Sequence, residues 1–258
     1  MAHFGGRVLY SIVRRLPIPI LIQLERASQV GQGKGWGAST VTMEVAAGLS
    51  LLPDDGARGV VAIDAGANVG NWTAALLKAQ PSASILAVEP SEAANDQLSK
   101  RFAGDSRVHI EKVALGSSRG EALLWSDRPG SGLASLERRR LDHFGIDFDH
   151  SEEVSVRTLD EVVGDLGRNP SILKLDVEGR EIDVLKGASR TIAEVDVIQF
   201  EFGGCNIDTR TFFQDFWHLL VPAGFGIWRL GPQGLAKVES YMEQDEAFGT
   251  TNFFAARG

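Results

Sequence analysis

Five acidic residues lie at or just past the ends of predicted strands: Asp64, Glu89, Asp176, Glu178 and Glu201. Ligands of open α/β sheets bind beyond the carboxyl ends of the strands. Core strands seldom bury unpaired acids, because removing a charge from water is costly. The recurrence therefore predicts a ligand site along one edge of a sheet. The alternative for each acid is a helix-capping role, as Glu178 would have for the helix that follows it.

The first of these acids opens a glycine-rich turn. Residues 60–63 are an uninterrupted apolar run, typical of a strand that is buried on both faces of a parallel sheet. Residues 64–70 (DAGANVG) follow, and then apolar residues recur at helical spacing. Gly66 and Gly70 lack a β-carbon, so a ligand can lie close to the turn, near the positive end of the helix dipole. The alternative is an ordinary glycine turn of an α/β protein.

A second strand ends in another acid. Residues 84–88 form a buried-strand run, and Glu89-Pro90 comes directly after it, about 20 positions beyond the glycine turn. An acid at this place is suited to bind ribose hydroxyls, which predicts a nucleotide-bearing cofactor. The glycine spacing differs from the G-x-G-x-x-G of dinucleotide sites, and no P-loop motif is present.

Lys174 and Asp176 lie two residues apart on a predicted strand and so point to the same face. A lysine in a buried strand needs a partner, and we expect the two to pair. The pair either positions Asp176 or is purely structural. His143 lies in the irregular insertion at residues 116–156, beside an aspartate, where a base or metal role competes with that of an inert loop histidine.

Three motifs of this sequence resemble those of the FkbM-type methyltransferases: residues 64–70, residues 88–90 (VEP) and residues 173–179 (LKLDVEG). The resemblance runs from residue 60 to the C-terminus, where residues 252–255 (NFFA) are similar to the closing strand of that family. It implies a Rossmann-like class I methyltransferase fold and S-adenosylmethionine as cofactor. It also implies methyl transfer to a hydroxyl of a sugar, glycolipid or polyketide-type acceptor.

The resemblance places Val113 and Ala114 near the adenine of the cofactor and Asp176 next to the sulfonium. Together with the acids and the turn, the predicted cofactor-binding set is Asp64, Gly66, Asn68, Gly70, Glu89, Pro90, Val113, Ala114 and Asp176. Methyl transfer to oxygen requires an acceptor held in line, exclusion of water and removal of the hydroxyl proton. The candidates for the catalytic role are Asp176, Glu178, Glu201 and His143, and no metal is expected.

The elements that must position these residues form an α/β fold. We expect a mostly parallel sheet with an antiparallel C-terminal strand, made of strands at residues 60–64, 84–88, 108–115, 171–176, 195–202 and 252–256, with an extra strand at 121–125 and a hairpin at 226–239. The predicted division is an N-terminal helical extension with a glycine-rich loop at residues 1–55 and a methyltransferase domain at residues 56–258.

The N-terminal extension carries apolar residues at helical spacing at positions 8–16, flanked by arginines. Residues 16–22 are apolar but too short to span a bilayer, and they contain two prolines. We expect the segment to dock against the domain, a partner subunit or a membrane surface. The glycine-rich loop at residues 31–37 is either a lid over a ligand or a linker anchored by Trp36.

The composition of the 258 residues narrows the classes of protein. A hydrophobic content of 43% is that of a folded globular chain, and a formal net charge of −8 argues against nucleic-acid binding. A single cysteine fits a reducing compartment, so we expect a cytoplasmic protein. The expected partner is a small-molecule or glycan acceptor, with homo-oligomerisation left open. The alternatives are an NAD-linked oxidoreductase and a non-catalytic methyltransferase-like binding module.

Overall fold

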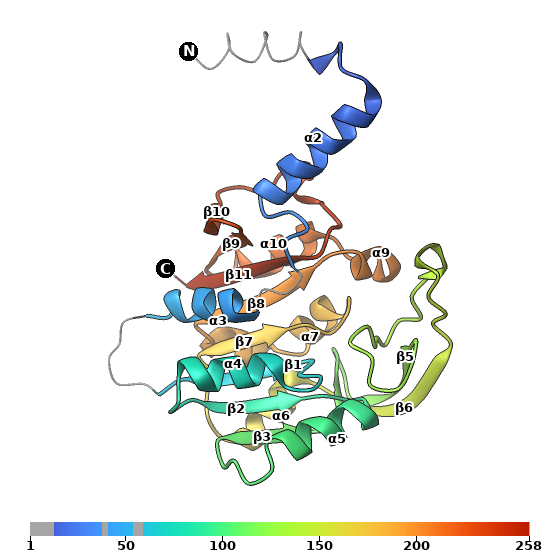
Figure 1. Ribbon diagram of the computed structural model, residues 1–258. Helices are drawn as coiled ribbons and strands as arrows, with labels where there is room; N and C mark the ends of the chain where they lie inside the picture. Colours follow the sequence, from blue (N-terminus) through green and yellow to red (C-terminus); the bar gives the residue numbers. More distant parts are fainter. Residues whose placement is uncertain (1–12, 38–40, 54–58, 258) are drawn as a thin grey trace.

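An eight-stranded sheet forms the centre of the computed structural model, which describes residues 13–37, 41–53 and 59–257 (Figure 1). The strand order across the sheet is β10-β9-β11-β8-β7-β1-β2-β3. Its strands are β1 (Val61–Ala65), β2 (Ser84–Val88), β3 (Val108–Glu111), β7 (Ile172–Leu175), β8 (Val197–Phe202), β9 (Phe225–Gly231), β10 (Gly234–Val238) and β11 (Thr251–Arg257).

The direction of the strands confirms the predicted fold class. Strands β3, β2, β1, β7 and β8 are parallel neighbours. The C-terminal strand β11 lies between β8 and β9 and is antiparallel to both. The hairpin expected at residues 226–239 is the antiparallel pair β9 and β10. The sheet is thus mostly parallel, with β11 and β10 running opposite to the other strands.

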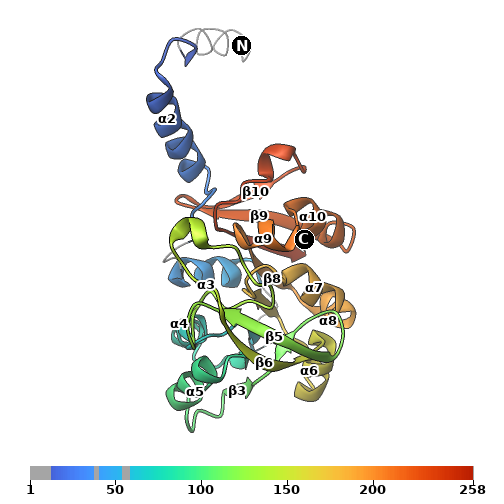
Figure 2. The ribbon, with the colours of Figure 1, turned by 90° about the vertical axis from the view of Figure 1, so that its right-hand side faces the viewer.

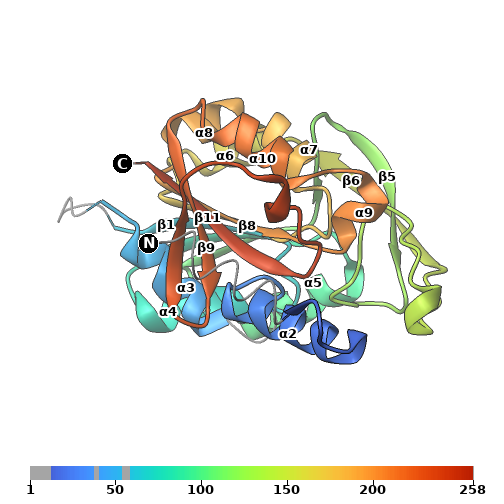
Figure 3. The same cartoon turned by 90° about the horizontal axis from the view of Figure 1, so that it is seen from above.

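Helices cover both faces of the sheet, as Figure 3 shows from above. One face carries α3 (Val41–Ser50), α4 (Asn71–Ala79) and α5 (Glu92–Arg101), and the other carries α6 (Leu159–Leu166), α7 (Glu181–Lys186), α8 (Ser189–Glu194) and α10 (Phe213–Leu220). Strand β1 is therefore buried along its whole length, which explains why its sequence does not alternate between apolar and polar residues.

The third predicted strand, at residues 108–115, is split in two. Strand β3 ends at Glu111 in the main sheet, and β4 (Ala114–Leu115) belongs to a separate sheet of order β4-β6-β5, with β5 (Gly120–Ser126) and β6 (His150–Arg157). The extra strand expected at residues 121–125 is thus β5, while β6 was not predicted. The remaining short elements are α9 (Cys205–Thr209) and the 3₁₀ turns η1 (Asp142–Phe144) and η2 (Glu243–Asp245).

The N-terminal extension contains two different helices. Helix α2 (Ile18–Gly31) stands off the body, whereas α3 packs on α4 and contributes the buried residues Val45 and Ala47 to the core (Figure 1). The predicted pattern at residues 8–16 begins outside the described residues, as does the boundary proposed at residues 55–56. Among the described residues, no helix is long and apolar enough to cross a membrane.

Candidate active site

A cavity of about 270 Å³ lies at the carboxyl ends of the central parallel strands. Its lining comes from the turn after β1, the end of β2, the segment after β7, the end of β8 and the loop between β5 and β6. Parallel strands bring their carboxyl ends to one edge, so residues distant in sequence meet there. Nine predicted site residues line the cavity: Gly66, Asn68, Glu89, Pro90, Val113, Ala114, Asp176, Glu178 and Glu201.

The other three predicted site residues lie away from this lining. Asp64 is fully buried behind it, and Gly70 begins α4 and packs against Leu98 and Phe102. His143 is exposed on η1, where its ring lies 4.1 Å from that of Phe144. Within the described part of the chain, no group of histidine, cysteine and acidic residues is placed to hold a metal.

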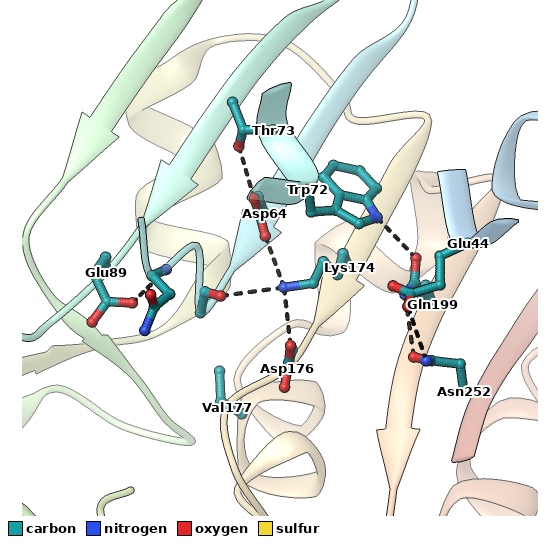
Figure 4. Close-up of polar contacts among 12 residues, drawn as sticks. Glu44, Asp64, Trp72, Thr73, Glu89, Lys174, Asp176, Val177, Gln199 and Asn252 are labelled. Atoms are coloured by element: carbon teal, nitrogen blue, oxygen red, sulfur yellow. Dashed lines mark hydrogen bonds and ion pairs between the residues drawn. The ribbon is translucent and has the colours of Figure 1, made fainter. Parts of the chain in front are cut away.

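Lys174 is the centre of a buried polar network (Figure 4). Its Nζ donates to Asp64 Oδ1 at 2.9 Å and to the Gly66 carbonyl oxygen at 3.2 Å, and it lies 3.4 Å from Asp176 Oδ2. Burial lowers the pKa of Lys174, but the charges of Asp64 and Asp176 outweigh it and hold that pKa above its ordinary value. The expected pairing of Lys174 with Asp176 is confirmed, and Asp64 joins it as the closer partner.

Asp64 therefore acts on the site through Lys174. Its second carboxylate oxygen accepts a hydrogen bond of 2.7 Å from Thr73 Oγ1, so both oxygens are taken by protein donors. The two strands are in register at this point, with Asp64 opposite Lys174. A carboxylate so placed can orient the lysine but does not reach the cavity.

Gly66 is required by the protein's own backbone. A β-carbon at this position would lie 1.8 Å from the carbonyl oxygen of Asp176, and the residue has a φ of 76°, which favours glycine. The Asp176 amide donates to the Ala65 carbonyl oxygen at 3.1 Å. The sequence predicted that a ligand would approach Gly66 closely, whereas the group that occupies the place of its β-carbon is the Asp176 carbonyl of the segment after β7. Two of the three motifs therefore meet at this point.

Glu89 is a buried carboxyl group held by backbone amides. One oxygen accepts from Asn68 N at 2.8 Å and the other from Ser91 N at 2.9 Å. Burial raises its pKa to about 7, and the two amides oppose that rise. A carboxylate has about four acceptor positions, so two remain for the hydroxyls of a ligand in the cavity.

The opposite wall carries Glu178 and Glu201. Glu178 has a φ of 53°, unusual for a residue other than glycine, and its Oε2 accepts from Arg139 Nη1 at 2.6 Å. Burial and the charge of Asp176 raise its pKa to about 8 against the opposing effect of Arg139. The same two causes raise the pKa of Glu201 well above its usual range. Helix α7 begins only at Glu181, so Glu178 does not cap it.

Sequence reasoning missed a second polar network in the cavity wall (Figure 4). Gln199 donates to Glu44 Oε2 at 2.7 Å and accepts from Trp72 Nε1 at 3.1 Å, while Asn252 Nδ2 donates to Glu44 Oε1 at 3.2 Å. Glu44, Trp72 and Asn252 line the cavity. The available signal was a glutamate on the apolar helix that precedes the glycine turn, but its partners lie 155 and 208 residues away.

Comparison with known proteins adds independent findings. A family model described as the methyltransferase FkbM domain matches residues 64–226. Methyltransferase 1 of Beauveria bassiana (strain ARSEF 2860) is 26% identical over 152 residues, or 53% of this chain and 59% of the relative. Methyltransferase sdnD of Sordaria araneosa is 31% identical over 152 residues, or 48% of this chain and 59% of the relative. The matched segments thus span about three fifths of each relative's length.

Two solved structures that align with this chain at low sequence identity are described as methyltransferases. The precorrin-6y C5,15-methyltransferase of Geobacter metallireducens GS-15 aligns with a TM-score of 0.47 at 10% identity, covering 84% of this chain and 87% of that one. The plantazolicin methyltransferase BpumL, in complex with SAH, aligns with a TM-score of 0.45 at 9% identity, covering 95% of this chain and 93% of that one.

Proposed function

Because this chain belongs to the FkbM methyltransferase family, we propose that it transfers a methyl group from S-adenosylmethionine to a hydroxyl of a sugar, glycolipid or polyketide-type acceptor. One observation carries the proposal. Glu89, Asp176 and the glycine turn, which belong to three separate motifs, line the same cavity. The same cavity holds two further carboxyl groups, Glu178 and Glu201, on the side away from Glu89's strand.

The residues present fit this cofactor. Glu89 offers two free acceptor positions for a ribose, and Val113 and Ala114 supply part of the cavity wall next to it. The carboxylate of Asp176 in the wall favours a ligand that carries a positive charge. S-adenosylmethionine, when bound, supplies an electrophilic methyl group on a sulfonium.

We assign to Asp176 the binding and deprotonation of the acceptor hydroxyl. Its carboxylate is partly exposed to the cavity, and Lys174 fixes it from behind. A carboxylate so held can accept the hydrogen bond of an acceptor hydroxyl and take its proton. A carboxylate near the sulfonium also stabilises the ground state, so the benefit of Asp176 must come from orientation or proton removal.

Glu178 and Glu201 are the alternative bases. Burial and the charge of Asp176 raise the pKa of both groups, so each keeps its proton to a higher pH than an exposed glutamate does. In that form they donate hydrogen bonds to acceptor oxygens. We assign them the positioning of a polyhydroxylated acceptor, for which a wall of carboxyl groups is suited.

The cofactor is tested first by binding. S-adenosylhomocysteine should bind to the full-length chain and raise its melting temperature, since a ligand of the folded state stabilises it. Calorimetry that finds NAD binding and no S-adenosylhomocysteine binding would replace the proposal with the oxidoreductase alternative. Binding without turnover on any of a panel of sugars, glycolipids and polyketides favours the binding-module alternative.

The chemistry is tested with Asp176→Asn, which keeps the size of the side chain but removes its charge and basicity. We expect S-adenosylhomocysteine affinity to stay within about tenfold of the parent. Turnover, followed as release of S-adenosylhomocysteine, should fall by roughly 10²-fold or more. Asp165→Asn, at a surface ion pair on α6, is the matched control. Near-normal turnover of Asp176→Asn removes this residue from catalysis and moves the test to Glu178, Glu201 and His143.

A further inference from the structure

Helix α2 projects from the body (Figures 1 and 2), and several of its large apolar side chains are exposed to solvent. None of its residues is buried. Ile18 is 68% exposed, and Ile20, Ile22 and Leu24 are each between 42% and 50% exposed. Large aliphatic residues gathered at one projecting site mark an interaction surface.

The apolar residues of α2 surround its first two turns. At about 100° per residue, Ile18 and Ile22 lie on one side, and Ile20 and Leu24 lie on the other. A flat protein face covers one side of a helix only. A helix with apolar residues on all sides is stable where apolar groups surround it, as in the interior of a protein or a membrane.

The charges next to this apolar tip have one sign. Arg14 and Arg15 are exposed and lie four and three residues before the first residue of α2, and no acidic residue occurs in the sequence before Glu25. The whole chain has a formal net charge of −8, so its N-terminal segment is a cationic exception. Cations beside an apolar tip complement the negative surface of an anionic bilayer, which repels the acidic body.

We propose that Arg14, Arg15 and the first turns of α2 insert into the headgroup region of a bilayer that contains anionic phospholipid. With 14 residues, α2 lies in the interface and does not span the membrane. A second copy of the chain is the competing occupant, but a single protein face would cover only one side of α2, whereas its apolar residues lie on both sides. The proposal does not depend on the proposed methyl transfer.

The link from α2 to the body is fixed. Gly35 N donates to Thr251 Oγ1 at 2.9 Å, and Arg229 Nε donates to the Gln32 carbonyl oxygen at 2.8 Å. These bonds hold the glycine-rich loop to β11 and β9, and the loop continues to Gly37 in the cavity lining. A membrane-bound α2 would therefore hold the cavity near the bilayer, within reach of an amphiphilic acceptor.

The test is flotation of the full-length chain with vesicles of phosphatidylcholine alone or with one third phosphatidylglycerol. We expect binding to the anionic vesicles that is weakened by salt. Ile18→Glu/Ile22→Glu should lower the affinity at least tenfold. Arg14→Gln/Arg15→Gln should lower it roughly 25-fold, about fivefold for each lost charge. Leu123→Glu/Met242→Glu is the matched control, because it places two acids at exposed apolar sites of the body and should bind like the parent.

The proposal would be overturned if the parent chain does not bind to anionic vesicles, or if Ile18→Glu/Ile22→Glu leaves that binding unchanged. It would also be overturned if the parent chain does not bind vesicles but forms a dimer in light scattering that this variant dissociates. The last result would assign α2 to self-association. Unchanged melting temperature and circular dichroism in each variant establish that the loss is not one of folding.

Discussion

Glu89 shows how one buried side chain can make ligand binding depend on pH. Its pKa is raised to about 7, and ribose hydroxyls require its ionised form as an acceptor. The ionised fraction rises as pH increases through 7, so affinity for S-adenosylhomocysteine should rise about tenfold between pH 6 and pH 8. Calorimetric titration across that range measures it.

The matched variants are Glu89→Gln and Glu89→Ala. The first should bind with a flat pH profile, because an amide does not titrate. The second should weaken binding at pH 8 by about 1.5–3 kcal/mol, the scale of a hydrogen bond to a charged group. A flat profile in the parent chain would mean that Glu89 does not contact the ligand.

Replacing only one member of the Lys174–Asp64 pair should lower the free energy of unfolding, because the other charge is left buried without its partner. Lys174→Met leaves Asp64 fully buried with Thr73 as its remaining side-chain partner and should lower the free energy of unfolding by about 3–5 kcal/mol. Lys174→Met/Asp64→Asn should recover part of that loss, because no unpaired charge remains. Urea denaturation of both variants decides this, and equal losses would show that the pair is not coupled.

At the scale of elements, α3 belongs to the core while α2 does not. A chain that begins at Gly56 loses α3 and uncovers the apolar cluster around Trp72, Leu76 and Phe254. We expect it to aggregate in light scattering. A chain that begins at Gln32 loses α2 and the residues before it but keeps α3, and it should remain monodisperse. If the Gly56 chain is monodisperse with unchanged assembly, α3 is not needed to cover the sheet.

The elements that sequence reasoning identified are those with local signals. The apolar runs predicted β1, β2, β7 and β8 because burial on both faces removes polar residues from the run itself. The acids at the strand ends then located the cavity. The reason for Gly66 was not predictable, because it depends on a backbone crossing with a residue 110 positions away. The break between β3 and β4 escaped notice since residues 108–115 contain no glycine or proline to mark it.

From the sequence, only those contacts of the site that join residues of the same strand segment could be predicted. The pairing of Lys174 and Asp176 follows from their spacing of two. Asp64 as the closer partner depends on the register of neighbouring strands, which no local pattern contains. The same holds for Arg139 beside Glu178, because the irregular loop that carries Arg139 has no periodicity from which to place it.

At the scale of the whole molecule, the buried acids should set the dependence of stability on pH. Burial raises the pKa of Glu89 and Glu181 to about 7 and that of Glu178 to about 8. The folded state then binds more protons than the unfolded state between about pH 5 and pH 8. The free energy of unfolding should therefore fall as pH rises through this window. The pKa of Asp105 is lowered to about 2 by Arg107, so Asp105 affects the free energy of unfolding only at more acidic pH.

Urea denaturation at intervals from pH 5.5 to pH 8.5 measures this slope. Glu181→Gln should flatten it, because Glu181 is fully buried and accepts from the Val177 and Gly179 amides through one oxygen that an amide can replace. Asp165→Asn should leave the slope as in the parent. A free energy of unfolding that rises with pH between 6 and 8 would contradict the expected proton balance.

The place of β11 has a consequence for synthesis on the ribosome. This strand is made after every other strand of the sheet, yet it lies between β8 and β9. Until residues 251–257 pair with them, β8 and β9 each have an open edge, and open edges invite pairing with other chains. The sheet is completed in one late step, when β11 pairs with both β8 and β9.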